Sequence, residues 1–307
     1  MIPNLFLVGV QRSATTGLWT YLGQHPEIFM APKELHHFGS DLGRHGTQVN
    51  RGARPDRAQY LAYFEDAGDV HYAGDASVGY IYSTTAALEI KEHSPDARIL
   101  VSFRNPVDMA YSLHSLMTFQ GAESEPSLEV AVSDGSQPRW AFTSWPFRWA
   151  FTYPRLLRFS EQLQRYLDVF GPERVHVVLY EDFVADPASV YRGITEFLGV
   201  DVGFTPEFPV VFANREERSR LVTRWLKRTP LPVRGMARLV VPSRSARRAL
   251  GTRIISANQK VVPRPELDSA TRRRLSDALS SEVASLGAMI GRDLLAEWSF
   301  GPSLTST

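Results

Sequence analysis

The sequence predicts an α/β protein with three layers, in which a central parallel sheet is flanked by helices on both faces. Short apolar runs rich in Val, Ile and Leu alternate with helix-like segments along the first 200 residues, a pattern typical of parallel strands that are buried on both sides. The composition agrees, because 43% of the 307 residues are apolar and 22% are charged, as in globular proteins with a sizeable core.

Each element follows from its own local pattern. The predicted strands cover residues 5–10, 98–103 and 174–180. The predicted helices cover residues 15–23, 84–93, 189–198 and 267–290, and one more begins at Val107. Gly199 stands where a helix C-cap favours glycine, and Asp268-Ser269 suits a helix N-cap. Residues 118–146 are rich in Ser, Glu, Gly and Pro, which predicts a long surface loop.

The positive charge of the chain is concentrated in one segment. Lys and Arg number 34 against 33 Asp and Glu over the whole chain, yet residues 214–275 hold 17 of the basic residues and only four acidic ones. This surplus favours an anionic partner for that part of the surface, or a solvated basic face. We expect a single domain over residues 1–307, with a basic segment at 214–265 that no pattern places.

Composition and hydropathy exclude several classes of protein. The chain has no cysteine, so it has no disulfide framework, no cysteine-ligated metal site and no thiol nucleophile. Its longest apolar runs are far shorter than the roughly 20 residues that cross a bilayer. Met1 leads into the first strand without the basic start and cleavage site of a signal peptide. We therefore expect a cytoplasmic protein, or one peripheral to a membrane.

The most informative segment is LFLVGVQRSATTG, residues 5–17, in which an apolar strand is followed by a loop of small and hydroxyl residues and then a helix. The amides of such a loop and the N-terminus of such a helix converge on one point, where the helix dipole adds positive potential. Threonine hydroxyls and the planar guanidinium of Arg12 add further donors. The segment predicts a P-loop-like fold with a site for a phosphate group.

This loop differs from the P-loop that binds ATP or GTP, whose pattern is G-x-x-x-x-G-K-[ST]. Counted from Gly9, the last three positions are occupied by Ala14, Thr15 and Thr16. The lysine that contacts the β- and γ-phosphates is therefore missing. Its absence argues against a nucleotide kinase.

A second anchor for an anion lies in FRNPVDMAYS, residues 103–112. Arg104 follows the second predicted strand at its carboxyl end, which is where ligands of open α/β sheets bind. Ser112 lies about two helical turns further on, so its hydroxyl can face the same crevice. Together with the first loop, this pair predicts a second phosphate on the same ligand.

These residues resemble the sulfotransferases that use PAPS (3′-phosphoadenosine 5′-phosphosulfate), in particular the heparan sulfate-type and related bacterial enzymes. VGVQRSATTGLWTYLGQHPEIFMAPKELHHF is similar to their 5′-phosphosulfate loop and the acidic segment after it, and RILVSFRNPVDMAYS is similar to their 3′-phosphate motif. Similarity continues through VHVVLYEDFVADPASVYRGITEFLG and the C-terminal helix. It covers residues 4–200 and 266–298 and leaves 214–265 uncovered.

The resemblance implies PAPS as sulfuryl donor, adenosine 3′,5′-bisphosphate as product nucleotide, and no metal. The residues it assigns to the donor are Arg12, Ser13, Ala14, Thr15, Thr16 and Gly17 for the 5′-phosphosulfate, Arg104 and Ser112 for the 3′-phosphate, and Tyr180 beside the adenine. The family has Gly where Ala14 stands. It has Ser-Pro within the segment that corresponds to GDASVGYIYS, residues 74–83, so the roles of Asp75 and Ser77 stay open.

Sulfuryl transfer requires positioning, charge stabilisation and a base for the acceptor proton. Arg12 and the loop amides are expected to stabilise the charge that develops on the leaving phosphate. The resemblance makes Glu34 the base, with His36 as the alternative. Because an ordinary carboxyl has a pKa near 4.3, we expect burial by neighbouring apolar side chains to raise the pKa of Glu34, with Lys33 opposing that shift.

The expected acceptor is a hydroxyl, or an amine, of a carbohydrate, glycolipid or natural product. Residues 217–240 interleave basic residues with apolar ones and with Trp225, which favours peripheral contact with an anionic membrane or with a lipid-linked acceptor. The same cations are also suited to close over the nucleotide. Two other functions are open: a P-loop-type nucleotide kinase, and a non-catalytic nucleotide- or nucleic-acid-binding module. The sequence lacks a recognition-helix or RNA-binding signature, so we expect no nucleic-acid partner.

Overall fold

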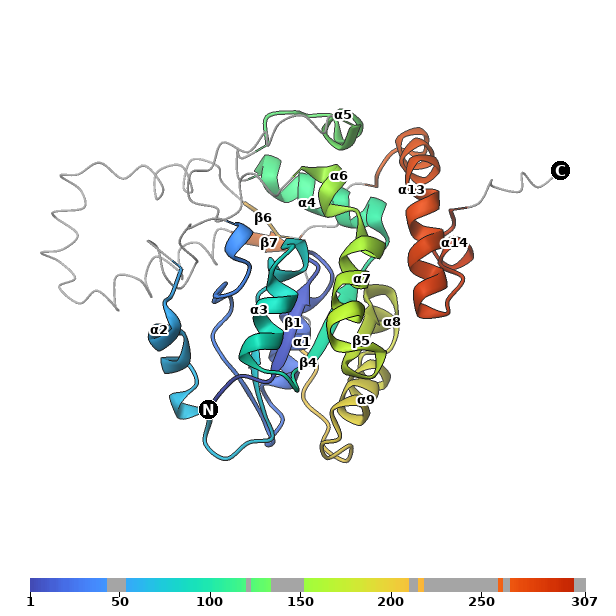
Figure 1. Ribbon diagram of the computed structural model, residues 1–307. Coiled ribbons are helices and arrows are strands. Elements are labelled where there is room, and N and C mark those ends of the chain that lie inside the picture. Colours follow the sequence, from blue (N-terminus) through green and yellow to red (C-terminus); the bar gives the residue numbers. More distant parts are fainter. Residues whose placement is uncertain are drawn as a thin grey trace, which may run out of the picture. The chain divides into compact units, whose positions relative to one another are not determined.

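The central element is a five-stranded parallel sheet (Figure 1). The computed structural model describes residues 1–42, 54–119, 123–133, 152–209, 215–217, 259–261 and 266–300. The strands are β1 (Leu5–Gly9), β2 (Ile28–Met30), β3 (Tyr72–Asp75), β4 (Arg98–Phe103) and β5 (Val175–Leu179), in the order β2-β3-β1-β4-β5. Every neighbouring pair in this order is parallel. The predicted fold class is confirmed.

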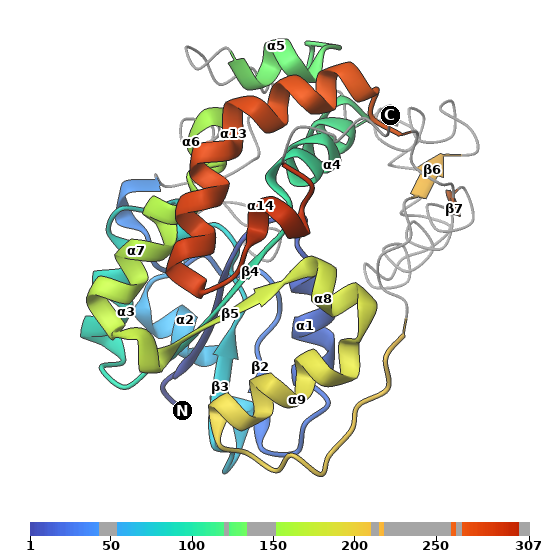
Figure 2. The same ribbon diagram turned by 90° about the vertical axis from the view of Figure 1, so that its right-hand side faces the viewer.

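Helices cover both faces of the sheet. They are α1 (Thr15–Leu22), α2 (Arg57–Ala62), α3 (Ala86–His93), α4 (Pro106–Phe119), α5 (Leu128–Ser133), α6 (Tyr153–Leu156), α7 (Phe159–Phe170), α8 (Tyr180–Ala185), α9 (Pro187–Leu198), α13 (Ser269–Ile290) and α14 (Leu294–Glu297). Short 3₁₀ turns are η1 (Ser40–Leu42), η2 (Glu65–Ala67), η3 (Tyr80–Tyr82) and η4 (Pro172–Arg174). Figure 2 shows α1, α8 and α9 on one side of the sheet and α3 and α7 on the other. No helix in the described part of the chain combines the length and apolarity that a bilayer span requires.

The chain divides into two compact units. The first comprises residues 1–209 and 267–307 and contains the parallel sheet. The second, residues 210–266, coincides closely with the basic segment 214–265. Within it the structure describes one antiparallel pair, β6 (Arg215–Glu217) and β7 (Gln259–Val261). The prediction of a single domain over residues 1–307 stays a prediction.

The predicted elements with long apolar runs or clear caps are confirmed. Strands 5–10, 98–103 and 174–180 correspond to β1, β4 and β5. Gly199 is left-handed at the end of α9, with φ 70°, and the Asp268 carboxylate caps α13 by accepting from the Thr271 amide. The prediction of a loop over residues 118–146 is wrong in part, because α4 continues to Phe119 and α5 forms as Leu128 and Ala131 become buried. Residues 120–122 and 134–146 lie outside the described residues.

The core requires a glycine where β1 ends. All five residues of β1 are buried, and a Cβ added to Gly9 would lie 2.5 Å from Ile81 Cγ2 and 2.7 Å from Ile81 Cβ. This packing brings the start of the following loop close to η3. Gly193, within α9, is different, since a Cβ added there would have no neighbour within 4 Å.

Gly9→Ala is therefore expected to lower the free energy of unfolding by about 1–3 kcal/mol, the usual effect of an overpacked core. Gly193→Ala is the matched control and is expected to raise it by up to about 1 kcal/mol, because alanine favours an exposed helix more than glycine does. Urea denaturation of the two variants measures both values. An unchanged stability of Gly9→Ala would contradict the tight contact with Ile81.

Candidate functional site

The site residues gather at the carboxyl ends of the five parallel strands. β1 and β4 are neighbours in the sheet, and the chain leaves them in opposite directions, toward β2 after β1 and toward β5 after β4. Such a switch point is where open α/β sheets bind their ligands. The segments that follow β2 and β3 begin at the same edge of the sheet, since all these strands are parallel.

The loop after β1 has the backbone of an anion-binding nest. Arg12 and Ala14 are both left-handed, with φ 65° and 60°, and this alternation turns successive amides toward one side. Val10 N donates to Ser102 O at 2.7 Å, and Ser102 Oγ donates to Ser13 O at 2.5 Å, so β4 holds the loop in place. Ser13 Oγ is buried and makes no hydrogen bond within the described residues. A cradle of this kind fits a phosphate group.

The two anchors predicted from the sequence meet in the fold. Arg12 Nε donates to Ser112 Oγ at 2.8 Å, although 100 residues separate them. Arg104 Nη1 donates to the Arg12 carbonyl oxygen at 3.2 Å. Arg104 Nε is buried and makes no hydrogen bond within the described residues. Two guanidinium groups and a hydroxyl thus lie close together at the sheet edge, and each of them can hydrogen-bond a phosphate oxygen.

Tyr180 lies directly against the second anchor. Its ring is stacked under Arg104, with Cζ 4.1 Å from the ring centroid, and it begins α8 where β5 ends. The stacking holds the guanidinium plane in one orientation. Contact of Tyr180 with an adenine stays a prediction. Its contact with Arg104, which the sequence alone did not show, positions the guanidinium group.

Glu34 and His36 form an ion pair after β2, with His36 Nε2 2.7 Å from Glu34 Oε2. Burial tends to raise the pKa of Glu34, but the hydrogen bond from His36 and the charges of His36 and Lys33 outweigh it, so the pKa lies below its ordinary value. The expectation of a raised pKa was therefore wrong in direction. The carboxylate is therefore ionised at neutral pH.

Lys33 contacts the phosphate loop, which sequence reasoning missed. Its Nζ donates to Thr15 Oγ1 at 2.9 Å and to Thr16 Oγ1 at 3.3 Å. Burial lowers the pKa of Lys33 to about 8, although the adjacent charge of Glu34 acts in the opposite direction. The sequence signal for this contact was weak, since β2 has only three residues. No sequence pattern indicated that the segment after β2 reaches the loop.

A buried polar network holds the segment that carries Glu34 and His36. Ser77 Oγ accepts from the amides of Leu35 and His36 at 3.1 and 3.0 Å and donates to Asp75 Oδ1 at 2.6 Å. The Asp75 carboxylate also accepts from the buried hydroxyls of Tyr60 (3.0 Å) and Tyr80 (2.7 Å). Burial raises the pKa of Asp75, while these hydrogen bonds act against that shift. Asp75 and Ser77, whose roles the sequence left open, are positioning residues.

Ser77→Ala is expected to lower the free energy of unfolding by about 1–3 kcal/mol, because two buried amides lose their acceptor. It is also expected to lower kcat while adenosine 3′,5′-bisphosphate binds as before, since the segment it positions carries the proposed base and not the nucleotide site. Thermal denaturation, turnover and calorimetry measure the three quantities. Ser280→Ala on the exposed face of α13 is the control. A stability loss with unchanged kcat would leave the network a structural role only.

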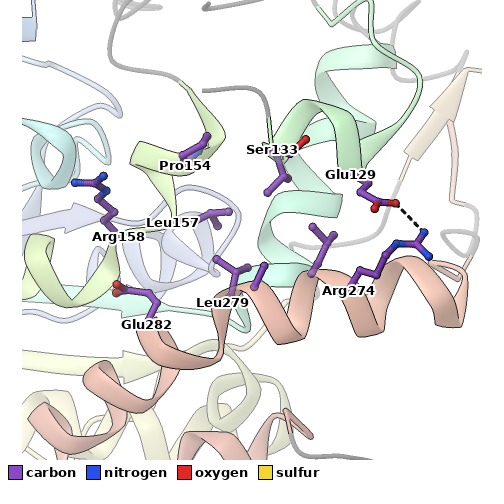
Figure 3. Close-up of a pocket in the computed structure, with 11 residues that line it drawn as sticks. Glu129, Ser133, Pro154, Leu157, Arg158, Arg274, Leu279 and Glu282 are labelled. Carbon is purple, nitrogen blue, oxygen red and sulfur yellow. Dashed lines mark hydrogen bonds and ion pairs between the residues drawn. The ribbon is translucent and has the colours of Figure 1, made fainter. Parts of the chain in front are cut away.

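A separate cavity of about 360 Å³ lies among α5, α6 and α13. Its lining is largely apolar, and Figure 3 shows the Glu129–Arg274 ion pair, 2.7 Å long, beside it. None of the residues that line it belongs to the anchors at the strand ends. Within the described ranges, no three His, Asp or Glu side chains gather as ligands of a metal would.

Comparisons with known proteins agree on one family. The family model described as "Sulfotransferase family" matches residues 81–206. Heparan sulfate glucosamine 3-O-sulfotransferase 6 of Mus musculus is 26% identical over 199 residues, covering 64% of this chain and 52% of that protein. The bifunctional heparan sulfate N-deacetylase/N-sulfotransferase 1 of Homo sapiens is 23% identical over 216 residues, covering 64% and 22%. The chain thus spans about half the length of the first of these relatives.

A solved structure matches nearly the whole chain. The crystal structure of a sulfotransferase from Alicyclobacillus acidocaldarius is 26% identical, with a TM-score of 0.69, and the match covers 97% of this chain and 98% of that one. The resemblance drawn from the loop and from the strand-end arginine therefore extends to the fold. The chain is thus similar to sulfotransferases in sequence over residues 81–206 and in fold over nearly its whole length.

Proposed function

We propose that the chain transfers a sulfuryl group from PAPS to a hydroxyl, or an amine, of a carbohydrate, glycolipid or natural-product acceptor. The observation that carries this proposal is the hydrogen-bonded connection from Arg12 to Ser112 and from Arg104 to Arg12. It joins two sites for anions at the sheet edge, as a nucleotide phosphorylated at both ends requires. When bound, PAPS supplies a sulfuryl group on a phosphate leaving group.

Each group of residues has a different role in the transfer, which follows from its position. Arg12 and the amides of its loop are placed to stabilise negative charge on the 5′-phosphate, and Arg104 with Ser112 is placed to hold the 3′-phosphate. Glu34 takes the acceptor proton while the new bond from sulfur to the acceptor forms. The bond from sulfur to the 5′-phosphate oxygen breaks, and its electron pair stays on that oxygen.

His36 supports Glu34 and does not replace it. Its Nε2 already contacts the Glu34 carboxylate, and the amide of His36 is held by Ser77. This contact keeps Glu34 oriented and in the ionised form that accepts a proton, while the lowered pKa reduces its strength as a base. We therefore assign the proton transfer to Glu34 and a positioning role to His36.

The contacts of Thr16 favour sulfuryl transfer over a nucleotide kinase. In an NTP-binding P-loop the hydroxyl at this position is a ligand of Mg²⁺. Here the Thr16 hydroxyl accepts a hydrogen bond from the Lys33 ammonium. A cation already in contact with that hydroxyl competes with Mg²⁺ for it.

The acceptor class and location are further parts of the proposal. The relatives named above act, by their names, on heparan sulfate, which supports a carbohydrate hydroxyl or amine as acceptor. We also propose a cytoplasmic or membrane-peripheral location. The membrane contact predicted for residues 217–240 lies outside the described residues apart from Glu217, and flotation with anionic liposomes at low salt tests it.

Calorimetric titration tests the proposed donor directly. Adenosine 3′,5′-bisphosphate is expected to bind much more tightly than adenosine 5′-monophosphate, since only the first can engage Arg104. ATP with Mg²⁺ is the comparison for the kinase alternative, and a duplex DNA fragment at low salt is the comparison for a nucleic-acid-binding module. Equal affinity for the two adenosine nucleotides, or preferred binding of ATP with Mg²⁺ or of DNA, would reject the assignment.

A further inference from the structure

We propose that Lys33 is a further catalytic residue, whose ammonium contacts the sulfuryl group between the phosphate loop and the base. This inference rests on the proposed function and adds a residue to it. The starting observation is the pair of hydrogen bonds from Lys33 Nζ to the hydroxyls of Thr15 and Thr16. Lys33 is also the chain neighbour of Glu34. It therefore links the loop proposed to hold the donor to the residue proposed to activate the acceptor.

The fold fixes the backbone on both sides of Lys33. On its N-terminal side, the Ala31 carbonyl oxygen accepts from Trp19 Nε1 of α1 at 2.9 Å, and the Ala31 amide donates to Gly74 O of β3 at 2.9 Å. On its C-terminal side, the Leu35 amide donates to Ser77 Oγ. Because the segment is anchored at both ends, the reach of Lys33 to the loop is a property of the tertiary structure.

The direction of transfer places the sulfuryl group beside this ammonium. In an in-line transfer the sulfuryl group lies between the donor phosphate and the acceptor atom. The loop with Thr15 and Thr16 marks the donor side, and Glu34 marks the acceptor side. Lys33 contacts the first and adjoins the second. Its side chain is therefore the cation best placed for the oxygens that gain charge as the bond breaks.

The hydrogen-bonding capacity of the groups supports the same conclusion. An ammonium has three protons, and the two threonine hydroxyls accept two of them, which leaves one for a ligand. Each hydroxyl that accepts from Lys33 keeps its own hydrogen to donate to an anion. The chain lacks the P-loop lysine at the position of Thr15. Lys33 supplies a cation to the same loop from a different strand.

Because the contribution of Lys33 depends on its charge, donor binding is expected to depend on pH. Burial lowers the pKa of Lys33 to about 8, so the cation is fully present below that pH and is lost as the pH rises through it. The charged group that acts on it is Glu34 of its own segment, which contacts His36, and Glu34 in turn acts on Tyr82 of η3. The pKa of Glu34 lies below its ordinary value and burial raises that of Tyr82. The affinity of the free enzyme for the sulfuryl donor is expected to fall above about pH 8.

The test compares Lys33→Met and Lys33→Arg by calorimetry with two ligands, PAPS and adenosine 3′,5′-bisphosphate. Lys33→Met is expected to raise the Kd of PAPS about tenfold, as loss of a hydrogen bond from a charged group does, and to change the Kd of the bisphosphate less than about twofold. Lys33→Arg keeps the charge, so the fall in PAPS affinity above pH 8 is expected to disappear. Release of bisphosphate from PAPS is expected to drop by about 10²-fold in Lys33→Met.

Lys91→Met is the matched control, because Lys91 also donates a hydrogen bond, to Pro95 O, but lies near the C-terminal end of α3, which leads to the amino end of β4. Unchanged PAPS affinity in Lys33→Met, or an equal loss for both ligands, would overturn the proposal, the second outcome making Lys33 part of the phosphate cradle alone. If Lys33→Met does not fold, the pH dependence of Lys33→Arg decides. Failure of the unmodified protein to bind either nucleotide would instead reject the proposed function.

Discussion

Glu34→Gln is expected to remove most of the turnover and to leave donor binding intact. Glutamine keeps the shape of the side chain and a hydrogen bond with His36, but it cannot accept a proton. Loss of a general base typically costs about 10²–10⁴-fold in rate. Turnover with PAPS and a calorimetric titration with adenosine 3′,5′-bisphosphate measure the two effects. Full activity in this variant would reject Glu34 as the base and leave the family assignment in place.

The control for this experiment is a second Glu–His pair of the same chain. Glu27 Oε2 lies 3.3 Å from His71 Nδ1 on an exposed part of the surface. Glu27→Gln makes the same chemical change away from the strand ends, so turnover is expected to stay within about twofold of the original, as for surface substitutions in general. A comparable loss in both variants would indicate a general electrostatic or folding effect.

The pH dependence of the Glu34 pair has a definite sign. The pKa of Glu34 in the fold lies below its ordinary value, so the pair contributes stability above the pKa of the unfolded chain and loses it as the pH falls through the lower, folded pKa. Glu34→Gln is therefore expected to lower the melting temperature at pH 7, and the difference is expected to shrink toward pH 3. A difference that grows on acidification would contradict the ion pair.

Arg104→Ala is expected to raise the Kd of adenosine 3′,5′-bisphosphate by roughly 10- to 100-fold, since a hydrogen bond to a charged group contributes about 1.5–3 kcal/mol. Adenosine 5′-monophosphate lacks the 3′-phosphate, so its weaker binding is expected to change little. The selectivity between the two ligands, measured by calorimetry, is thus the quantity that Arg104 controls. Arg12→Ala, at the other anchor, is expected to weaken the binding of both ligands.

Arg98→Ala is the matched control for Arg104→Ala. Arg98 begins the strand that Arg104 follows, and its guanidinium lies 5.1 Å from the Phe197 ring centroid, much as Arg104 lies over Tyr180. It is at the amino end of the sheet, away from both anchors. Both variants lose a stacked guanidinium, and only one is expected to lose nucleotide selectivity. Equal losses would indicate a general effect of removing such a contact.

The elements predicted from the sequence are those with a local signature. β1, β4 and β5 are strands of five or six residues dominated by apolar side chains, so the sequence predicts their burial without a partner. β2 and β3 have three and four residues and carry no such run. They become strands because they pair with each other and because β3 also pairs with β1, and pairing is a tertiary property.

One omission was avoidable. α7 buries Phe159, Leu163, Tyr166 and Phe170 on one face, a spacing of three and four residues that predicts an amphipathic helix. The signal was present in the sequence, although the preceding residues 134–151 gave no start to count from. Helix periodicity alone was thus enough to predict this element.

By itself the sequence determined the phosphate loop at Arg12 and the strand-end arginine at Arg104, because a strand followed by a loop and a helix is encoded in adjacent residues. The tertiary structure alone decided that Lys33 reaches that loop and that Ser77 holds the segment with Glu34. Those contacts depend on two short strands, with β3 pairing with β1 and β2 pairing with β3. Distances between residues so far apart in the chain are set by strand pairing and side-chain packing. Both depend on residues from several segments, so no single segment of the sequence predicts them.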